Sequence, residues 1–266
     1  MSIHPTAVID SGARLGADVS VGPFAVIERQ VEVGAGCVIG PHVTILPHTT
    51  LGPGCQVHAG AVLGDLPQDL GFKGDETWVR IGARCVSREG VTIHRGTKPG
   101  TATEVGDECF LMATAHLAHN VKLGSRVIIA NGTMLGGYVQ VGERAFISGA
   151  VVIHQFVRIG RLAMLGGQVG LSKDVPPFCT ALSGVVNTVV GLNVVGMRRA
   201  GLGTAERQSI KEAFALLYRS GLNVSQAVER IRAAVPAGPA LELAEFVAHS
   251  QRGICRFVAQ AEAAED

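Results

Sequence analysis

The chain has 266 residues, of which 47% are hydrophobic and only 5% aromatic, so any large core must be built from aliphatic and small side chains. The net charge of +1 at pH 7 argues against a nucleic-acid-binding protein and against strong attraction to an anionic membrane. No signal peptide and no apolar run long enough to span a bilayer is recognisable. We therefore expect a cytoplasmic protein with no stable membrane insertion.

A six-residue repeat runs from the start of the chain to about residue 176. Steps of six from Ile3 to Leu171 meet Ile, Leu or Val at every position except Asp69, Asp75, Ser87 and Pro99. A period of six is not helical, but it is a multiple of the two-residue period of a strand. Each hexapeptide is therefore predicted to be one short strand and a corner, and stacked coils would bury one continuous core. The sequence predicts a mainly β protein with a parallel β-helix over residues 1–178.

The fourth residue after each aliphatic position is nearly always small or β-branched. Four of the six cysteines stand at this position, namely Cys37, Cys55, Cys85 and Cys109. Because this position takes small inward side chains, the four cysteines are predicted to be buried packing residues and not disulfide partners. No two cysteines form a CxxC pair, which argues against a zinc or redox motif. Glycine often follows the aliphatic residue directly, as at Gly34 and Gly124. We expect these glycines to supply the unusual backbone angles of a turn.

The repeat pattern resembles that of the hexapeptide-repeat acyltransferases. In those proteins three hexapeptides make one triangular coil, and the β-helix is left-handed. The left hand is implied by the resemblance alone, since the general rule for parallel crossovers predicts the right hand.

Two polar segments, near residues 65–80 and 95–104, interrupt the repeat but preserve its register. Both contain Gly, Pro and Thr, so they are predicted to be loops that leave the prism. Loops on a rigid scaffold often carry function. After residue 178 the register ends, and residues 179–197 are predicted to be an apolar connector. Residues 198–266 have apolar residues at helical spacing, which predicts a small α-helical C-terminal domain.

None of the eight histidines within the repeat occupies an inward position, so all eight are expected on corners or outer faces. His119 is distinguished by its column, because residues three hexapeptides apart stack on successive coils about 4.8 Å apart. That column continues with Gly137, Gln155 and Lys173. The missing side chain of Gly137 would leave space beside the imidazole and expose a backbone N–H. A base next to a backbone donor suits acyl transfer.

Seven segments together are more specific than the repeat, in the order QDLGFKGDET, VTIHRGT, AHLAHN, HQF, DVPPF, GLNVVGMRR and RGICR. They resemble, across essentially the whole chain, the acyl-carrier-protein-dependent UDP-N-acetylglucosamine O-acyltransferases that start lipid A biosynthesis. The resemblance implies a cytoplasmic homotrimer with active sites between neighbouring prisms. It also implies transfer of a 3-hydroxyacyl group from acyl carrier protein to the 3-hydroxyl of UDP-N-acetylglucosamine. No cofactor is implied beyond the phosphopantetheine that carries the acyl group.

The resemblance also implies roles for single residues. His119 matches the general base, and the backbone N–H of Gly137 would hold the oxyanion. Contacts with the nucleotide sugar are implied for His116, His154 and Gln155, and contacts near the uridine and phosphates for Asn193 and Arg199. Gln68 and Asp69 of the first loop would line the acyl and sugar pocket, His94 is a further candidate substrate contact, and Gly167 would leave room for a longer acyl chain.

Four positions depart from the family pattern, and the family's GN motif is not recognisable in ALSGVVNT. Gly71 stands where Lys is usual, with Lys73 two residues on as a candidate substitute. Tyr138 replaces a His and carries no positive charge, although it can stack or donate a hydrogen bond. Asn120 replaces an Asp, so carboxylate support of the base is expected to be lost, and Ala200 replaces an Arg. The departures lie on the sugar-nucleotide side, so a related acyltransferase with a modified nucleotide-sugar acceptor is an alternative.

Two further alternatives belong to other function classes. A trimeric metal enzyme like the γ-type carbonic anhydrases would use the same prism, with His94, His116 and His119 as candidate ligands. Zinc requires about four tetrahedral ligands, and the three-residue spacing of His116 and His119 does not match that family's wider spacing, so we expect no metal. A non-catalytic scaffold is the other alternative, if the departures abolish sugar binding.

Overall fold

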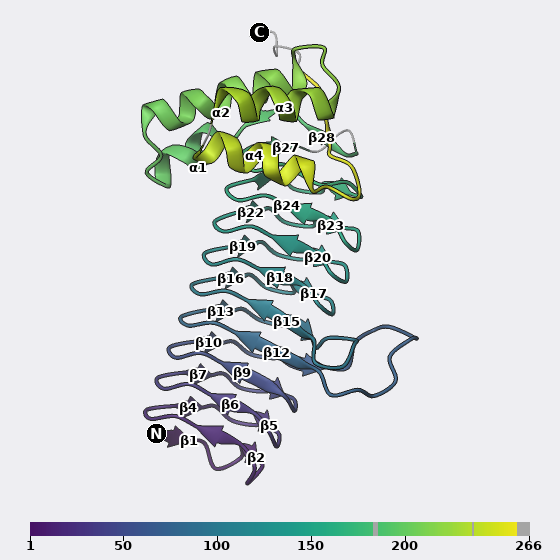
Figure 1. Ribbon diagram of the computed structural model, residues 1–266. Coiled ribbons are helices and arrows are strands. Elements are labelled where there is room, and N and C mark those ends of the chain that lie inside the picture. The colour runs from purple at the N-terminus through teal and green to yellow at the C-terminus, as the bar shows by residue number, and fades with distance from the viewer. Residues whose placement is uncertain (183–185, 236, 260–266) are drawn as a thin grey trace, which may run out of the picture.

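The computed structural model describes residues 1–182, 186–235 and 237–259, and it shows a long prism of parallel strands with helices at one end (Figure 1). Three sheets form the sides of the prism, and the chain visits them in turn. Strands on successive coils pair in parallel with an offset of three hexapeptides, as between His116 and Met134. The offset grows where a loop is inserted, as between Val62 and Thr92. The predicted parallel β-helix is confirmed.

The strands are short, and each sheet collects every third strand until the last coils. Sheet 1 contains β1 (Ser2–Ile3), β4 (Ser20–Val21), β7 (Val38–Ile39), β10 (Gln56–Val57), β13 (Val86–Ser87), β16 (Phe110–Leu111), β19 (Ile128–Ile129), β22 (Phe146–Ile147), β25 (Met164–Leu165), β27 (Cys179–Ala181) and β29 (Gly191–Leu192). Sheet 2 contains β2 (Val8–Ile9), β5 (Val26–Ile27), β8 (Thr44–Ile45), β11 (Val62–Asp65), β14 (Thr92–His94), β17 (His116–Leu117), β20 (Met134–Leu135), β23 (Val152–Ile153) and β26 (Gly170–Leu171). Sheet 3 contains β3 (Arg14–Leu15), β6 (Glu32–Val33), β9 (Thr49–Leu51), β12 (Trp78–Ile81), β15 (Ala102–Val105), β18 (Lys122–Leu123), β21 (Gln140–Val141) and β24 (Arg158–Ile159).

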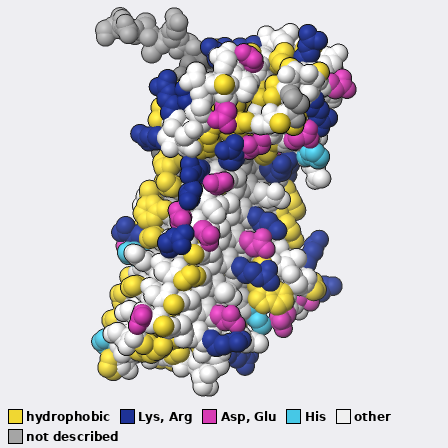
Figure 2. All heavy atoms as spheres, turned by 60° about the vertical axis from the view of Figure 1, so that its left-hand side comes forward, with side chains coloured by type: hydrophobic (Ala, Val, Ile, Leu, Met, Phe, Trp, Pro, Cys, Tyr) yellow, Lys and Arg dark blue, Asp and Glu magenta, His cyan; other side chains and the backbone are white. Residues whose placement is uncertain are grey.

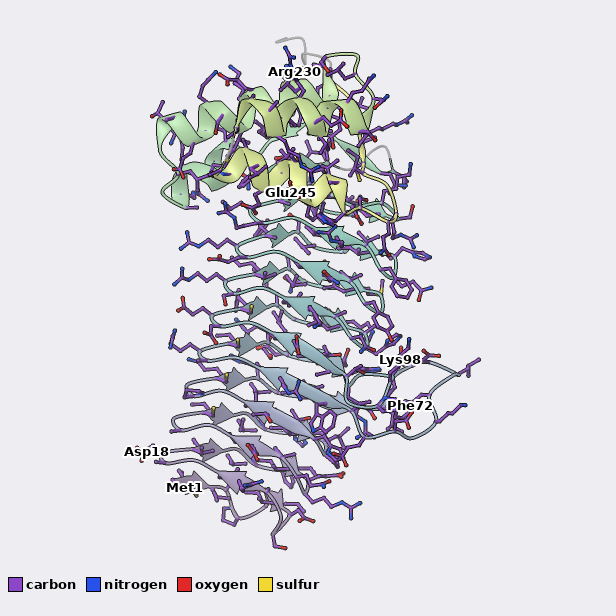
Figure 3. The ribbon with its side chains drawn as sticks, viewed as in Figure 1. Met1, Asp18, Phe72, Lys98, Arg230 and Glu245 are labelled. Carbon is purple, nitrogen blue, oxygen red and sulfur yellow. The ribbon has the colours of Figure 1, made fainter. Side chains whose placement is uncertain are left out.

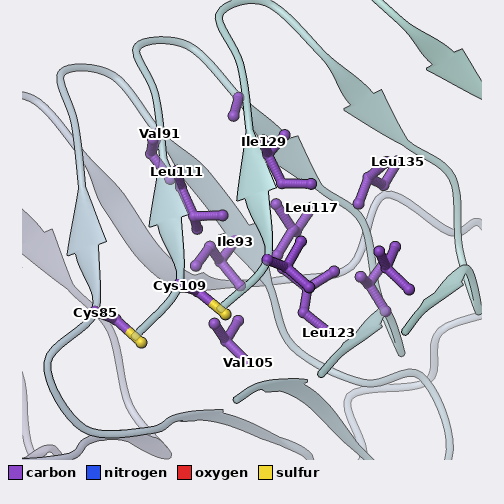
Figure 4. Packing of buried hydrophobic residues seen from close by; sticks show 14 of the residues in the cluster. Cys85, Val91, Ile93, Val105, Cys109, Leu111, Leu117, Leu123, Ile129 and Leu135 are labelled. Carbon is purple, nitrogen blue, oxygen red and sulfur yellow. The ribbon is translucent and has the colours of Figure 1, made fainter. Parts of the chain in front are cut away.

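The core inside the prism is narrow and aliphatic. From Val21 to Leu171 the stepped Ile, Leu and Val side chains point inward and are buried, and the cysteines lie in a row beside them (Figure 4). The Cys85 thiol donates a hydrogen bond to the carbonyl of Gly106 at 3.0 Å, and Cys109 donates to Gly124 at 3.2 Å. All six cysteines are buried and free of disulfides. The prediction that the repeat cysteines are packing residues is therefore confirmed.

The glycines that follow the aliphatic positions have a different role from the predicted one. Gly34 and Gly124 do not adopt positive φ angles. A Cβ built on either would lie 2.6–2.7 Å from a backbone nitrogen of the next coil, so glycine is needed because the coils approach closely. The left-handed angles fall two residues later, at Gly36 (φ 68°) and Arg126 (φ 60°). The expectation of unusual backbone angles at the first glycine is wrong.

Two loops, residues 66–77 and 95–101, leave the prism where the chain passes from sheet 2 to sheet 3. They project from the same corner and lie side by side, with Phe72 on one loop and Lys98 on the other (Figures 1 and 3). The Arg95 guanidinium carbon lies 5.9 Å from the centre of the Phe72 ring. The two interruptions of the repeat therefore flank one corner of the prism.

Sheet 1 continues past residue 178, where the repeat pattern predicts the end of the prism. Strand β27 pairs with β25 in parallel, and β29 pairs with β27 in antiparallel fashion. Part of the predicted connector therefore belongs to the prism. The hexapeptide pattern misses these strands because Pro176 and Pro177 break it, while the backbone still pairs beyond them.

Four helices cover the end of the prism formed by the last coils, opposite the N-terminus (Figure 1). They are α1 (Val194–Arg199), α2 (Thr204–Tyr218), α3 (Val224–Ala234) and α4 (Pro239–Ala248). They share a second core with Leu162 and Phe178 of the last coils, so exposed strand edges are avoided there. Strand β28 (Thr188–Val189) pairs with β30 (Arg256–Phe257). Helix α1 begins before residue 198. Residue 236 and residues 260–266 of the predicted helical domain, and residues 183–185 of ALSGVVNT, lie outside the described residues. In the described part of the chain, no helix combines the length and apolar character needed to cross a membrane.

Candidate active site

His119 lies at the corner between β17 and β18, beneath the two loops. It points away from the aliphatic core, as its register predicts, yet only 9% of its surface is exposed. His94, at the end of β14, is also outside the core and is 6% exposed. An outward position in the repeat therefore does not mean an exposed side chain here, because loops that have no repeat pattern cover this corner.

Gly137 lies on the next coil, directly beside the His119 ring. A Cβ built on Gly137 would overlap the Cε1 and Nε2 atoms of that ring, so only glycine fits. Among the described residues, the Gly137 N–H has no hydrogen-bond acceptor. The stacking inferred from the spacing of three hexapeptides is present, and it places a free backbone donor next to an imidazole.

The two ring nitrogens of His119 have different surroundings. Nδ1 lies 3.1 Å from the side-chain oxygen of Asn120. Nε2 lies 3.9 Å from Oδ2 of Asp69, which comes from the first loop. The other Asp69 oxygen accepts a hydrogen bond from the Gly71 N–H at 2.8 Å. Nε2 therefore faces the space between Gly137 and the loop, while Nδ1 is held from behind.

Gln68 and Lys73 are exposed side chains on the same loop. Neither has a hydrogen bond or ion pair with another described residue. That Lys73 takes over the role of the lysine usually found where Gly71 stands remains a prediction.

His94 and His116 form a second pair of imidazoles next to the corner. Their rings meet edge to face, with centroids 5.0 Å apart. The His116 Nδ1 lies 2.7 Å from the Thr92 hydroxyl. Burial lowers the pKa of both histidines; for His94, Asp65 opposes this effect and His119 adds to it. Both rings are therefore neutral at pH 7, which suits hydrogen bonding to an uncharged hydroxyl or amide better than to a phosphate.

His154 and Gln155 form an exposed rim one coil beyond Gly137. The Phe156 N–H donates to the Gly137 carbonyl at 2.9 Å, which fixes Gln155 in the same column as Gly137 and His119. The His154 Nδ1 lies 3.2 Å from the Gln155 carbonyl oxygen. These two side chains can reach a ligand that enters along the corner.

Asn193 and Arg199 lie elsewhere, against the outer face of sheet 1. They line a cavity of about 610 Å³ together with Arg126, Arg144 and apolar side chains of β19, β22 and α1. Asn193 caps α1, since its side chain accepts from the Gly196 N–H at 2.8 Å and donates to the Leu162 carbonyl at 2.9 Å. The cavity is cationic on one side and apolar on the other.

Arg126 and Arg144 also line this cavity, although the sequence did not predict them as site residues. They are three hexapeptides apart and therefore stack in one corner column, and two arginines at this spacing could have indicated the cavity. Arg126 donates a hydrogen bond to Glu108 at 2.9 Å, whereas the Arg144 Nε has no hydrogen-bond partner among the described residues and forms only an ion pair with its neighbour Glu143 at 3.5 Å. Arg144 Nη1 donates to the Ala200 carbonyl at 3.4 Å, so an arginine lies next to the position where the family's arginine is absent.

Gly167 lies at a third place, the corner between β25 and β26, where a Cβ would lie 3.4 Å from the Gly149 carbonyl oxygen. The residues predicted to form one site therefore fall on separate corners and faces of a single chain. One copy of the chain brings His119, Gly137, Asp69 and Gln155 together, but not Asn193, Arg199 or Gly167.

Comparison with known proteins supplies the family. A model described as bacterial transferase hexapeptide (six repeats) matches residues 30–65 and 102–137, and one described as UDP N-acetylglucosamine O-acyltransferase, domain 2, matches residues 174–255. A protein of Syntrophobacter fumaroxidans named acyl-[acyl-carrier-protein]–UDP-N-acetylglucosamine O-acyltransferase is 42% identical over 258 residues, covering 96% of this chain and 100% of its own. This chain belongs to that acyltransferase family.

Solved structures agree with the assignment. The UDP-N-acetylglucosamine acyltransferase of Bacteroides fragilis is 36% identical with a TM-score of 0.88, covering 95% of this chain and 99% of its own. The structure from Acinetobacter baumannii is 35% identical with a TM-score of 0.90, covering 96% and 100%. These relatives share the left-handed parallel β-helix, so the predicted fold class is confirmed, as is the resemblance to this acyltransferase family.

The two alternatives from other function classes are not favoured by these relatives. The described residues also contain no group of three or more His, Cys, Asp or Glu side chains placed to hold a metal ion. In this acyltransferase the neutral His94 and His116 therefore remain candidates for substrate contacts.

Proposed function

We propose that this acyltransferase moves a 3-hydroxyacyl group from acyl carrier protein to the 3-hydroxyl of UDP-N-acetylglucosamine, the first step of lipid A biosynthesis. Family membership supports the reaction class. The observation that carries the mechanism is the position of Nε2 of His119 beside the Gly137 N–H, which donates to none of the described residues. A base and an oxyanion donor at adjacent positions are what attack on a thioester requires.

In the proposed mechanism, Nε2 of His119 takes the proton of the acceptor hydroxyl as that oxygen attacks the thioester carbon. The Gly137 N–H donates to the oxygen that gains negative charge. The carbon–sulfur bond then breaks, and the imidazolium returns the proton to the leaving phosphopantetheine sulfur. All proton transfers run through one histidine, and the acyl donor arrives on the carrier protein.

The other candidate residues are proposed to bind the two substrates. His116, His154 and Gln155 would contact the nucleotide sugar, and Gln68, Asp69, Lys73 and His94 would line the pocket near the reacting groups. Asn193 and Arg199 would meet the uridine and phosphates, with Arg144 in the same cavity. Gly167 would lie near the end of the acyl chain.

The protein is proposed to act as a homotrimer, because a single chain separates the two halves of the site. The outer faces of the prism differ. Sheet 3 carries ion pairs such as Arg14–Glu32 at 2.9 Å and Lys122–Glu104 at 3.1 Å, whereas Val8, Met134 and Val152 of sheet 2 are 48–63% exposed. Figure 2 shows such a stripe of basic and acidic side chains bordered by hydrophobic ones. Exposed apolar surface favours association.

Packing of the sheet 1 cavity of one copy against the His119 corner of another would complete the site. A particle mass of three times the 27.6 kDa chain is expected by light scattering. A stable monomer that retains full turnover would contradict a site shared between copies.

We also propose that the protein works in the cytoplasm. All six thiols are buried and free, which fits a reducing compartment.

The test is mass spectrometry of products formed from a panel of acyl carriers and UDP-sugars. The expected product is UDP-N-acetylglucosamine acylated at the 3-hydroxyl. His119→Ala should lower kcat by about 10²–10⁴, and His249→Ala, an exposed histidine at the end of α4, should not. Acylation of a 3-amino sugar alone would favour the modified acceptor, for which the departures Tyr138 and Ala200 are the reason. Full activity of His119→Ala would remove the base from the mechanism.

A further inference from the structure

Two of the four departures from the family pattern are neighbours in space. Asn120 and Tyr138 are three hexapeptides apart, so they occupy the same corner position on successive coils. Both have left-handed backbone angles, with φ 61° in each case. Thr97, from the second loop, contacts both of them. The two changes therefore belong to one small structure behind His119.

The side-chain oxygen of Asn120 collects three hydrogen-bond donors. The Thr97 N–H and the Thr97 hydroxyl both donate to it at 3.0 Å, and the third contact is His119 Nδ1 at 3.1 Å. Asn120 is 5% exposed, and its own N–H donates to the Thr103 hydroxyl at 2.8 Å. Because the backbone N–H of Thr97 can only donate, the atom that faces it must be the amide oxygen and not the amide nitrogen.

This arrangement determines the tautomer of His119. An amide oxygen only accepts hydrogen bonds, so the Nδ1 atom that faces it must carry a hydrogen. Nε2 of the neutral ring then holds the lone pair, on the side of Gly137. A neutral side chain therefore does what a carboxylate does in a His–Asp pair, except that it adds no negative charge.

Tyr138 completes the network from the far side of Thr97. Because the Thr97 hydroxyl already donates its one hydrogen to Asn120, the Tyr138 hydroxyl, 2.9 Å away, must donate to Thr97. The Tyr138 ring meets the His119 ring edge to face with centroids 5.3 Å apart, and it stacks on Phe156 at 4.9 Å. The second loop is thus tied to the prism at the point where it covers the base.

We infer that Thr97, Asn120 and Tyr138 form an uncharged network that holds His119 as the Nδ1–H tautomer, with Nε2 free to act as the base. They are positioning residues, because they act through His119. The inference rests on the proposed function for its kinetic effects, but the tautomer itself does not depend on turnover.

The charged and titratable groups that face His119 set the background for a test by pH. From the first loop, the Asp69 carboxylate lies 3.9 Å from Nε2. From β14, His94 interacts electrostatically with His119. From the corner of the next coil, the Tyr138 hydroxyl is bound to Thr97. Since Asn120 is neutral, a carboxylate at this position would add a negative charge next to Nδ1 and stabilise the protonated His119 ring.

The kinetic test compares Asn120→Leu with Asn120→Asp. Asn120→Leu removes the acceptor for Nδ1–H, and kcat should fall about 10-fold to 100-fold with KM for the nucleotide sugar unchanged within about twofold, as expected when a base loses its correct tautomer. Asn120→Asp should keep kcat within about threefold and move the acidic limb of the kcat/KM profile to higher pH. Wild-type kcat in Asn120→Leu, or an unmoved acidic limb in Asn120→Asp, would overturn the inference.

A second series tests the connection through Thr97. Thr97→Val and Tyr138→Phe should each lower kcat by about threefold, and the double variant should be no worse than Thr97→Val, because both remove the same connection. The matched control is Thr101→Val, which removes hydroxyl hydrogen bonds to Lys98 within the same loop but not to Asn120. A loss of kcat in the control equal to that in Thr97→Val would mean that loop integrity alone matters.

Nitrogen-15 NMR of the histidine rings separates this inference from the proposed function. The His119 signals, assigned by their absence in His119→Ala, should report hydrogen on Nδ1 in the wild-type protein and a mixture of tautomers in Asn120→Leu. This readout holds even if the protein acylates none of the sugars tested. Hydrogen on Nε2 in the wild-type protein would overturn the inference whatever the substrate is.

Discussion

The His119 corner and the arginine-lined cavity beside α1 lie on different faces of the prism, and different kinds of structure form them. The corner is built from stacked coils and covered by two loops, and its base is held through the uncharged Asn120. The cavity lies where the last coils meet the helical end of the chain, and Arg126, Arg144 and Arg199 give it positive charge. The reacting groups are thus proposed to lie on the stacked coils, and the binding of a negatively charged substrate group at the junction between the coils and the helices.

This contrast has a physical basis. Strand spacing in a stacked sheet is nearly constant, so the distance between a base and a backbone donor on adjacent coils is set by the backbone itself. Long arginine side chains tolerate more variation in their environment, which suits a junction between two kinds of structure. Changes at the corner are therefore expected to alter kcat, and changes in the cavity to alter KM.

After loss of the base itself, the largest expected effect at the corner is that of Gly137→Ala. Its Cβ would overlap the His119 ring and displace the base, so kcat should fall by about 10²–10³ while the coil still stacks. Steady-state kinetics and a thermal melt check both points. The matched control is the same substitution in His119→Ala, where no ring is present to be displaced. If Gly137→Ala lowers the residual activity of His119→Ala by the same factor, the steric explanation is wrong and only the oxyanion contact is affected.

An intermediate effect is expected in the cavity. Arg144→Ala removes a guanidinium whose Nε makes no hydrogen bond to the described residues and only a 3.5 Å ion pair with Glu143. KM for the UDP-sugar should therefore rise about tenfold with kcat unchanged, the effect of one charge-assisted hydrogen bond. Arg84→Ala is the control, because Arg84 occupies the same column but is paired with Glu108 at 2.7 Å. A fall in kcat with constant KM would place Arg144 with the chemistry and break the comparison.

The smallest expected effect concerns stability and pH. Burial lowers the pKa of His94 and His116, so the unfolded chain, with an ordinary histidine pKa of 6.5, binds these protons more readily than the folded protein does. Their contribution to stability is fully present above about pH 6.5 and is lost as the pH falls toward the lowered values. His94→Asn should therefore reduce the loss of Tm between pH 7 and pH 5 by about 2 °C. An unchanged slope would show that His94 does not stay neutral in the folded protein.

Much of the fold could be predicted from the sequence because the repeat turns sequence distance into spatial distance. Ile93, Leu117 and Leu135 follow the six-residue step, and all three are buried in the core. The same register placed the cysteines inside and stacked Gly137 on His119. The role of Gly34 was misread, because the close approach of two coils is a property of neighbouring chains and not of one hexapeptide.

The candidate site was predicted only in part. The register located His119 and Gly137, and the ordered motifs supplied the other candidates. The register did not show that loops cover His94 and His119, or that the Asn120 oxygen accepts hydrogen bonds from Thr97. Both features depend on loop residues, which have no repeat. The end of the prism was also placed too early, since β27 and β29 pair without the aliphatic pattern.

By itself, the six-residue period of the sequence determined the short strands and the aliphatic core. The column that joins His119, Gly137 and Gln155 also needed the three hexapeptides per coil that the family resemblance implies, and the strand pairing has this offset. Only the tertiary structure decided the tautomer of His119 and the separation of the arginine-lined cavity from the base. Those features depend on loops and helices whose side chains pack without a period, so their contacts are set by shape and hydrogen bonding and not by spacing along the chain.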